Sequence, residues 1–392
     1  MITLKSTFTS WTLTDKTVFL RADLNVPLID GQIASDFRLQ ALVPTLDRLI
    51  AQGSKIILAT HLGRPQGHDQ ALSTRILMPW FKQHGYTLQF APTLEQAQAL
   101  RDQVQRDGSI ILLENLRFWP EERTSNFEFA LALKQLADYY VNDAFGAAHR
   151  TDTSVTLLAE LYSPKHKSIG LLMQKELEVL TYLKEKPKQP FLLVLGGGKV
   201  KDKLPLLQAL LPKVAMIALC PAVVFTFLKA LGVPVGTSLV DDTLIDTARQ
   251  ILEQARDNNV SVFFPADYLV FNRAQRDNEL ITPEQFTDLM SGISIGPKTV
   301  TLFKQALAQA NTIFLNGACC ITEQQASCIF FNELLQAIAQ ASAYSVVGGG
   351  DTVNAVYKQK LEHKIDFCST GGGATLTYLS GHPLPALISM LR

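Results

Sequence analysis

Short apolar runs with β propensity alternate with helix-like stretches along the whole chain, and this alternation restricts the fold more than any other feature. Runs typical of buried strands occur at 17–20, 55–59, 109–113, 139–142, 191–195, 214–219, 260–264, 312–315, 344–347 and 367–369. Helical spacing separates them, as at 38–52 and 126–138. Strands that alternate with helices form parallel sheets. The sequence therefore predicts an α/β fold built on doubly wound parallel sheets.

The length of the chain predicts two domains. Its 392 residues exceed what one ordinary hydrophobic core holds. The stretch 170–186 is one helical pattern, and Pro187 and Pro190 follow it directly before a predicted strand. A helix that ends at a proline-flanked link is expected to connect two domains. The alternative is an ordinary surface helix.

Charge and cysteine usage restrict the class of protein. The 36 basic residues balance the 36 acidic residues, which argues against non-specific binding to nucleic acid or to a membrane surface. No apolar block suggests a signal peptide, and Pro221 interrupts the longest apolar run, 214–228. The five cysteines are odd in number and lack Cys-x-x-Cys spacing. These features predict a protein of a reducing cytoplasm.

Three glycine triplets, at 196–198, 348–350 and 371–373, each follow a predicted strand. Glycine loops at helix N-termini present backbone N–H groups to phosphate oxygens. Lys199 and Lys203 are four residues apart and would point the same way on a helix. Val200 stands where a Walker loop has Ser or Thr, and the absence of GxGxxG excludes a nicotinamide dehydrogenase. We expect a polyphosphate site here, the alternative being a tight turn with solvated lysines.

The two halves of the chain carry different chemistry after their strands. Arginines gather near strand ends in the first half, which suits a small, multiply anionic molecule, although any one of them alone could be a solvated loop residue. They are Arg21, Arg38, Arg64, Arg117 and Arg150. In the second half, Asp351 and Thr352 suit a metal carboxylate and a phosphate contact, with an N-cap role of Asp351 as the alternative. Glu323 could accept hydrogen bonds from ribose hydroxyls. The combination predicts phosphoryl transfer between a nucleotide and a small anion.

Nine motifs, in order and spacing, resemble the phosphoglycerate kinase family nearly from end to end. They are RADLNVPL (21–28), THLGRP (60–65), LLENLRF (112–118), VNDAFGAAHR (141–150), GLLMQKEL (170–177), LGGGKVKDKL (195–204), IGPKT (295–299), GGGDT (348–352) and STGGGATL (369–376). The resemblance implies a phosphoglycerate-binding domain at 1–169, an inter-domain helix at 170–187 and a nucleotide-binding domain at 188–374. It also implies that a tail at 375–392 returns to the first domain.

The resemblance further implies a monomeric glycolytic kinase that transfers a phosphoryl group directly between ATP and 3-phosphoglycerate, giving ADP and 1,3-bisphosphoglycerate, with Mg²⁺ and hinge closure. Its catalytic residues would be Arg38, Lys199, Lys203, Gly372 and Gly373. Its phosphoglycerate contacts would be Asp23, Leu24, Asn25, Arg38, His61, Leu62, Gly63, Arg64, Arg117 and Arg150. Its nucleotide contacts would be Lys199, Lys203, Asn316, Glu323, Gly349, Gly350, Asp351 and Thr352, with Asp351 as the metal ligand.

The sequence departs from the family pattern mainly in the expected nucleotide-base pocket. Cys220-Pro221-Ala222 and Ala318-Cys319-Cys320 replace glycine-containing turns, and Phe330-Phe331 replaces a Gly-Thr pair. In the first half, Asp152 replaces a histidine of the basic patch. These departures keep a second hypothesis open, namely a catalytically weak relative that binds phosphoglycerate or a protein partner and holds nucleotide poorly. The retained Lys199, Lys203, Asp351 and Thr352 argue for the active kinase.

Overall fold

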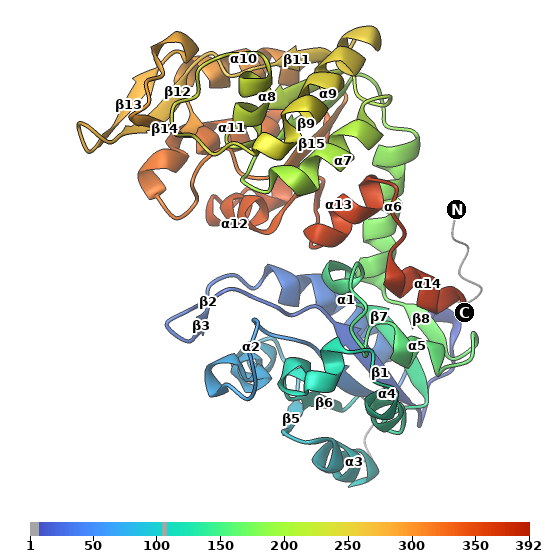
Figure 1. Cartoon of the computed structure of the whole chain (residues 1–392). Coiled ribbons are helices and arrows are strands. Elements are labelled where there is room, and N and C mark those ends of the chain that lie inside the picture. Colours follow the sequence, from blue (N-terminus) through green and yellow to red (C-terminus); the bar gives the residue numbers. More distant parts are fainter. Residues whose placement is uncertain (1–7, 104–107) are drawn as a thin grey trace. The chain divides into compact units, whose positions relative to one another are not determined.

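The computed structural model describes residues 8–103 and 108–392, which form two compact units (Figure 1). The first unit extends to Glu178 and includes the C-terminal segment Pro383–Arg392, and the second comprises Val179–His382. Helix α6 (Leu171–Glu185) continues from the first unit into the second. No helix among the described residues is long and apolar enough to cross a membrane.

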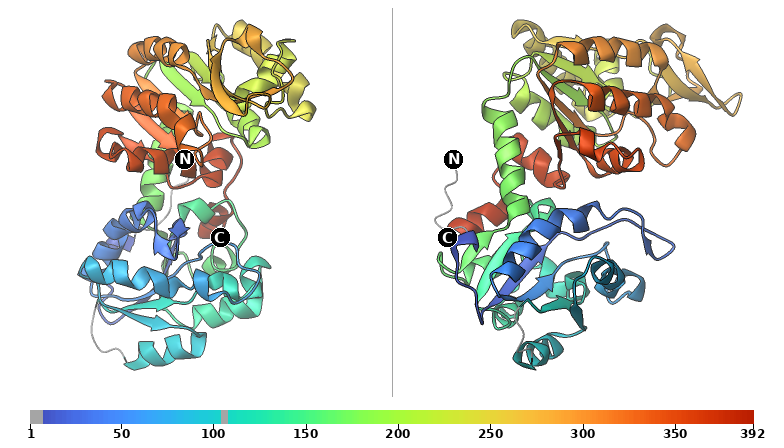
Figure 2. Two further views of the ribbon diagram at one scale, coloured as in Figure 1. Left: turned by 90° about the vertical axis from the view of Figure 1, so that its left-hand side faces the viewer. Right: turned by 180° about the vertical axis from the view of Figure 1, so that it is seen from behind.

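The first unit contains a six-stranded parallel sheet in the order β5-β6-β4-β1-β7-β8. Its strands are β1 (Thr17–Ala22), β4 (Lys55–Ala59), β5 (Leu88–Ala91), β6 (Ile110–Leu113), β7 (Tyr139–Asp143) and β8 (Lys167–Ile169). All six residues of β1 are buried, because helices cover both faces of the sheet in Figures 1 and 2. The polar residues that follow β1, β4, β6 and β7 therefore come together at one edge of this sheet.

The helices of this unit are α1 (Phe37–Ala51), α2 (Met78–Gln83), α3 (Leu94–Gln103), α4 (Phe127–Lys134), α5 (Leu157–Glu160) and α14 (Pro385–Leu391). The C-terminal helix, α14, belongs to this unit and lies beside β8 and α5 (Figure 1). The Lys167 ammonium donates to the carbonyl of Ser389 at 3.0 Å, and the backbone N–H of Ala386 donates to the carbonyl of Ala148 at 3.1 Å. A small hairpin, β2 (Leu28–Ile29) and β3 (Gln32–Ile33), precedes α1.

The second unit contains another six-stranded parallel sheet, in the order β11-β10-β9-β15-β16-β17. Its strands are β9 (Phe191–Leu195), β10 (Met216–Leu219), β11 (Ser261–Phe263), β15 (Thr312–Asn316), β16 (Tyr344–Gly348) and β17 (Phe367–Cys368). Its helices are α7 (Val200–Leu210), α8 (Val223–Ala230), α9 (Ile245–Asp257), α10 (Pro297–Gln309), α11 (Ile329–Gln340), α12 (Gly350–Lys358) and α13 (Gly373–Leu379). The strand order reverses between β9 and β15, the position where doubly wound sheets bind ligands.

The predicted fold class, two doubly wound parallel sheets, is confirmed. The strand pattern missed β5 and β8, and it missed an antiparallel sheet of β12 (Tyr268–Asn272), β13 (Asp277–Ile281) and β14 (Met290–Ile295). Strand β13 is polar, and only its last residue is buried. It therefore lacks the continuous apolar run by which buried parallel strands are recognised.

Candidate functional site

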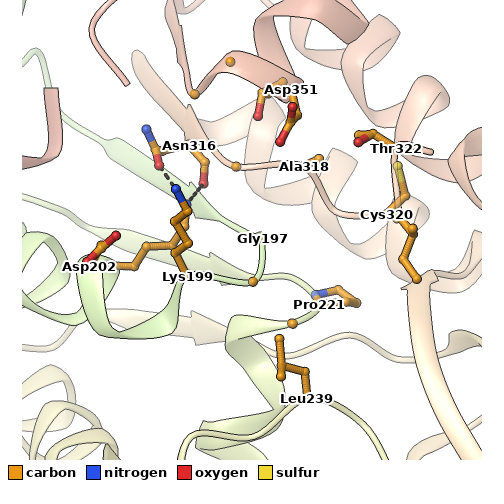
Figure 3. A pocket seen from close by; sticks show the side chains of 18 of the residues that line it. Gly197, Lys199, Asp202, Pro221, Leu239, Asn316, Ala318, Cys320, Thr322 and Asp351 are labelled. Carbon is orange, nitrogen blue, oxygen red and sulfur yellow. Dashed lines mark hydrogen bonds between the residues drawn. The ribbon is translucent and has the colours of Figure 1, made fainter. Parts of the chain in front are cut away.

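A cavity of about 490 Å³ opens at the carboxyl ends of β9, β15 and β16 in the second unit (Figure 3). All three glycine triplets reach it, each with two residues: Gly197 and Gly198, Gly349 and Gly350, and Gly372 and Gly373. The other predicted nucleotide contacts of this half also line it, namely Lys199, Lys203, Asn316, Glu323, Asp351 and Thr352. The structure therefore brings together in one pocket residues that span 197–373 in the sequence.

Three helices begin at this pocket. The N-cap residues of α7, α12 and α13 are Lys199, Gly349 and Gly372. The Lys199 side chain makes no capping hydrogen bond, and the two glycines have no side chain to make one. Gly349 has a φ of +96°, a conformation that side chains other than glycine rarely adopt. Unsatisfied N–H groups and the positive ends of the helix dipoles at these N-termini favour a bound anion. Their convergence suits a ligand with several phosphate groups.

Lys203 places a buried positive charge at the floor of the pocket. Its ammonium donates to Asn316 Oδ1 at 2.8 Å and to the Asn316 carbonyl at 3.1 Å, and the residue is only 6% exposed. Burial lowers the pKa of Lys203 to about 8. A Cβ on Gly317 would lie 2.5 Å from Lys203 Nζ and 2.0 Å from the Gly196 carbonyl oxygen, so this position requires glycine.

Two buried polar atoms at the pocket have no hydrogen-bond partner among the described residues. They are Thr352 Oγ1, in the first turn of α12, and Asn316 Nδ2, at the end of β15. Buried polar groups are normally satisfied. A ligand that carries hydrogen-bonding oxygens would supply the missing partners.

Asp351 is the candidate metal ligand, and its exposed carboxylate lies at the pocket in Figure 3. No group of three or more metal-binding side chains occurs in residues 8–103 and 108–392. A single carboxylate is nevertheless sufficient for Mg²⁺, which keeps several waters and is commonly bound by one or two carboxylates together with substrate phosphates. The residues present therefore fit a magnesium ion that arrives with a polyphosphate.

The first unit gathers its predicted residues at the carboxyl ends of β1, β4, β6 and β7. Asp23 follows β1 and accepts a hydrogen bond from Arg38, near the start of α1. Burial favours the neutral carboxyl, but the nearby positive charges of Arg38 and Arg21 outweigh it, and the pKa of Asp23 is lowered. Burial lowers the pKa of His61 well below its usual value, so this imidazole is neutral at physiological pH.

The loops after β1, β4 and β6 hold one another in place. Asn25 Oδ1 accepts a hydrogen bond from the backbone N–H of Gly63 at 2.8 Å, and the N–H of Leu24 donates to Thr60 Oγ1 at 2.9 Å. The Arg117 guanidinium donates to the Gly63 carbonyl, and Asn115 Oδ1 accepts from the N–H of Leu62 at 3.1 Å. The exposed Arg64 directly follows Gly63. These contacts order the loops before any ligand binds.

Asp152 alters the charge of the arginine cluster of the first unit, which includes Arg117 and Arg150. It is only 4% exposed, and its Oδ2 lies 3.0 Å from Arg150 Nε and 4.0 Å from an Arg117 nitrogen. Burial lowers the pKa of Arg117 to about 10, and the guanidinium remains charged at neutral pH. A carboxylate thus partly neutralises two residues that were predicted to bind an anion.

The sequence analysis did not predict a buried network of hydrogen bonds and an ion pair next to the predicted phosphoglycerate residues. Arg21, fully buried, donates to Ser154 Oγ at 2.7 Å, lies 3.3 Å from His61 Nδ1, and pairs with Glu122 at 3.7 Å. Arg21 could be recognised as a candidate because it lies near the end of a predicted strand, whereas no nearby sequence feature identifies Glu122 as its partner. In the second unit, Leu239 and the segment 291–293 of β14 also line the pocket. The segment 291–293 lies in β14, a strand that was not predicted, and Leu239 lies in the connection after α8.

Comparison with known proteins identifies the family. A family model described as phosphoglycerate kinase matches residues 8–382. The chain belongs to the phosphoglycerate kinase family. It is 39% identical over 377 residues to "Phosphoglycerate kinase" from a Nitratiruptor species, with 94% of each chain covered. It is also 37% identical over 387 residues to "Phosphoglycerate kinase, cytosolic" from Triticum aestivum, with 96% of each covered.

A solved phosphoglycerate kinase structure from Coxiella burnetii has a TM-score of 0.81 and 33% identity, and the match covers 98% of both chains. The predictions of the family, of the fold and of kinase activity in glycolysis are therefore confirmed. The enzyme is a phosphoglycerate kinase, and members of this family use ATP and ADP.

Proposed function

We propose that this kinase binds ATP or ADP in the glycine-lined pocket of the second unit and phosphoglycerate at the arginine cluster of the first. The observation that carries the first assignment is the convergence of three helix N-termini on one pocket. Such a site stabilises several phosphate charges at once. The substrates are then 3-phosphoglycerate with ATP, or 1,3-bisphosphoglycerate with ADP.

The nucleotide phosphates contact Lys199, Lys203 and the backbone of Gly349 and Gly350 in this proposal. Thr352 Oγ1 and Asn316 Nδ2 gain the partners that they lack without ligand. Glu323, exposed at the pocket, accepts hydrogen bonds from the ribose hydroxyls. Mg²⁺, when bound, neutralises phosphate charge, and Asp351 is the residue that holds it.

The phosphoglycerate contacts come from the residues ordered after β1, β4, β6 and β7. Arginine forks bind the phosphate group, and Arg64, Arg117 and Arg150 are the candidates. Asp23 and Asn25 accept hydrogen bonds from the substrate hydroxyl, with neutral His61 beside them. Leu24, Leu62 and Gly63 present backbone groups at the same edge of the sheet.

Catalysis in this proposal needs positioning and positive charge rather than a general base, because the carboxylate of 3-phosphoglycerate is already ionised at neutral pH. Phosphoryl transfer has a loose transition state whose charge lies on peripheral oxygens. Arg38, Lys199 and Lys203 stabilise that charge, with the backbone N–H groups of Gly372 and Gly373. Direct transfer also requires the phosphoglycerate and nucleotide residues to meet, and we propose that the two units close when both substrates are bound.

Calorimetric titration with ADP tests the nucleotide assignment. The expected result is that Asp351→Asn removes most of the effect of Mg²⁺ on ADP affinity. The matched control is Asp242→Asn, which removes an exposed carboxylate that pairs with Lys229 outside the 490 Å³ pocket. Equal dependence on Mg²⁺ in Asp351→Asn and in the natural protein would refute the role of Asp351. We further propose that the enzyme is monomeric, as the resemblance implies, and cytoplasmic, as the cysteine usage indicates.

A further inference from the structure

Two cysteine side chains meet at the rim of the nucleotide pocket. Cys320 and Cys328 have sulfur atoms 2.7 Å apart, and both residues are free thiols of intermediate exposure. Cys320 lines the pocket, where Figure 3 places it with Thr322 on the side opposite Lys199 and Asp202. Cys328 ends the short 3-10 helix η9 (Gln325–Cys328) and does not line the pocket. The sulfur atoms are thus in direct contact before any reaction.

The segment between the two cysteines contains pocket residues. Ile321, Thr322 and Glu323 all line the cavity, and residues 323–326 are exposed. The Cys328 thiol lies 3.6 Å from the Ile321 carbonyl oxygen and 3.7 Å from that of Gln324. These contacts turn the segment back on itself and hold Cys328 against Cys320.

We propose that Cys320 and Cys328 form a reversible intramolecular disulfide that weakens nucleotide binding. The proposal rests on the assignment of the pocket to nucleotide. It requires no large backbone movement, because the sulfurs already touch. Disulfides in reducing compartments are usually transient and often sense redox state.

A low-molecular-weight disulfide, such as glutathione disulfide, is the oxidant in this proposal. Burial, together with the hydrogen bond to Cys328, raises the pKa of the Cys320 thiol, so Cys320 is the poorer first nucleophile. The Cys328 thiolate attacks one sulfur of the oxidant and releases one thiolate, which takes up a proton. The Cys320 sulfur then attacks the Cys328 sulfur, loses its proton and displaces the second thiol. Two protein thiols are oxidised by two electrons, and one disulfide is reduced to two thiols.

The new bond closes a ring that contains Ile321, Thr322 and Glu323. Ring closure removes conformational freedom from this exposed segment. Glu323 can then no longer adjust its carboxylate to the ribose hydroxyls. We expect the dissociation constant of ADP to rise three- to tenfold on oxidation and to return to its original value with dithiothreitol.

Mass spectrometry tests the disulfide independently of nucleotide binding. Cleavage after glutamate cuts at Glu323, between the two cysteines, and separates fragment 285–323 from fragment 324–333. After treatment of the natural protein with glutathione disulfide, these fragments should remain linked, and tandem spectra should place the link at Cys320. Alkylation of the unfolded chain should fall from five thiols to three. Separated fragments with five alkylated thiols, or a stable glutathione adduct on one cysteine, would overturn the proposal.

Calorimetry with ADP tests the effect on binding. Cys328→Ser should bind ADP as the reduced natural protein does and should not respond to glutathione disulfide. Cys368→Ser is the matched control, because it removes a different half-exposed cysteine and should keep the full response. An unchanged or tighter affinity in the oxidised natural protein would refute the regulatory role. If the reduced protein binds no ADP, the nucleotide assignment itself fails, and the regulatory role with it, while mass mapping still decides whether the disulfide forms.

Discussion

The buried ammonium of Lys203 should make the stability of the protein depend on pH in a way that one substitution reveals. Burial lowers its pKa from the usual 10.5 to about 8 in the folded protein. Between these values the unfolded chain binds a proton that the folded chain does not. Stability therefore rises as pH increases from about 8 to 10.5, and this contribution is lost as pH falls through 8.

The expected magnitude follows from the difference between these two pKa values, which corresponds to about 3 kcal/mol. Lys203→Met removes this contribution. The substitution also leaves Asn316 Oδ1 without its donor, at a cost of about 1–3 kcal/mol that is the same at every pH, whereas the Asn316 carbonyl still accepts from the Gly196 N–H. The pH dependence of the difference between the two proteins therefore isolates the lysine.

Urea unfolding of both proteins between pH 7 and pH 10.5 measures this difference. The natural protein should gain about 3 kcal/mol relative to Lys203→Met over that interval. Lys199→Met removes an exposed lysine from the same glycine loop and serves as the matched control. Parallel curves for the natural protein and Lys203→Met would refute the reasoning, because they would mean that the ammonium is not desolvated on folding.

Four further outcomes are expected. Arg38→Ala should lower turnover by ~10²–10³ with an unchanged circular dichroism spectrum, since a preorganised contact to the transition state is lost; near-normal turnover would contradict its role. Asp152→Asn should lower KM for 3-phosphoglycerate several-fold in steady-state assays, because Arg150 and Arg117 lose a competing anion, and a raised KM would count against this interpretation. Small-angle scattering should show a smaller radius of gyration with both substrates bound, and an identical profile at saturation would argue against closure. Calorimetry should show that the natural protein discriminates weakly between ADP and GDP and that Cys320→Gly discriminates more strongly. Strong adenine selectivity in the natural protein would disprove the idea that Cys320 loosens the choice of base.

The departures from the family pattern in the expected base pocket show which features of the site could be predicted from the sequence and which could not. The cysteines at 220, 319 and 320 were all expected beside the nucleotide base. The structure fully buries Cys220 and Cys319, whereas Pro221, Ala222, Ala318 and Cys320 line the cavity. The strand ends were predictable from local apolar runs. Which of several consecutive residues faces the cavity depends on how the loops after β10 and β15 pack.

In the rest of the site, too, features with a local sequence signal could be predicted, and features that depend on distant contacts could not. The glycine triplets and Lys199 could be found because each follows an apolar strand directly, and strand, glycine and helix start are local signals. The burial of Lys203 could not be found, because it depends on Asn316, which lies 113 positions further along the chain. Likewise, Asp152 was visible as a departure, but its pairing with Arg117 and Arg150 was not.

The sequence alone determined the alternation of strands and helices, the parallel sheets and the residue types at the strand ends, because these depend on periodicity within a few residues. Only the tertiary structure decided which glycine loops share a pocket, which lysine is desolvated, and that Cys320 touches Cys328. The shared pocket and the desolvated lysine arise when elements far apart in the chain pack together, and the cysteine contact arises when the segment between Cys320 and Cys328 turns back on itself. Burial then changes the pKa of a charged group and the partners available to it, and neither can be worked out from neighbouring residues in the sequence.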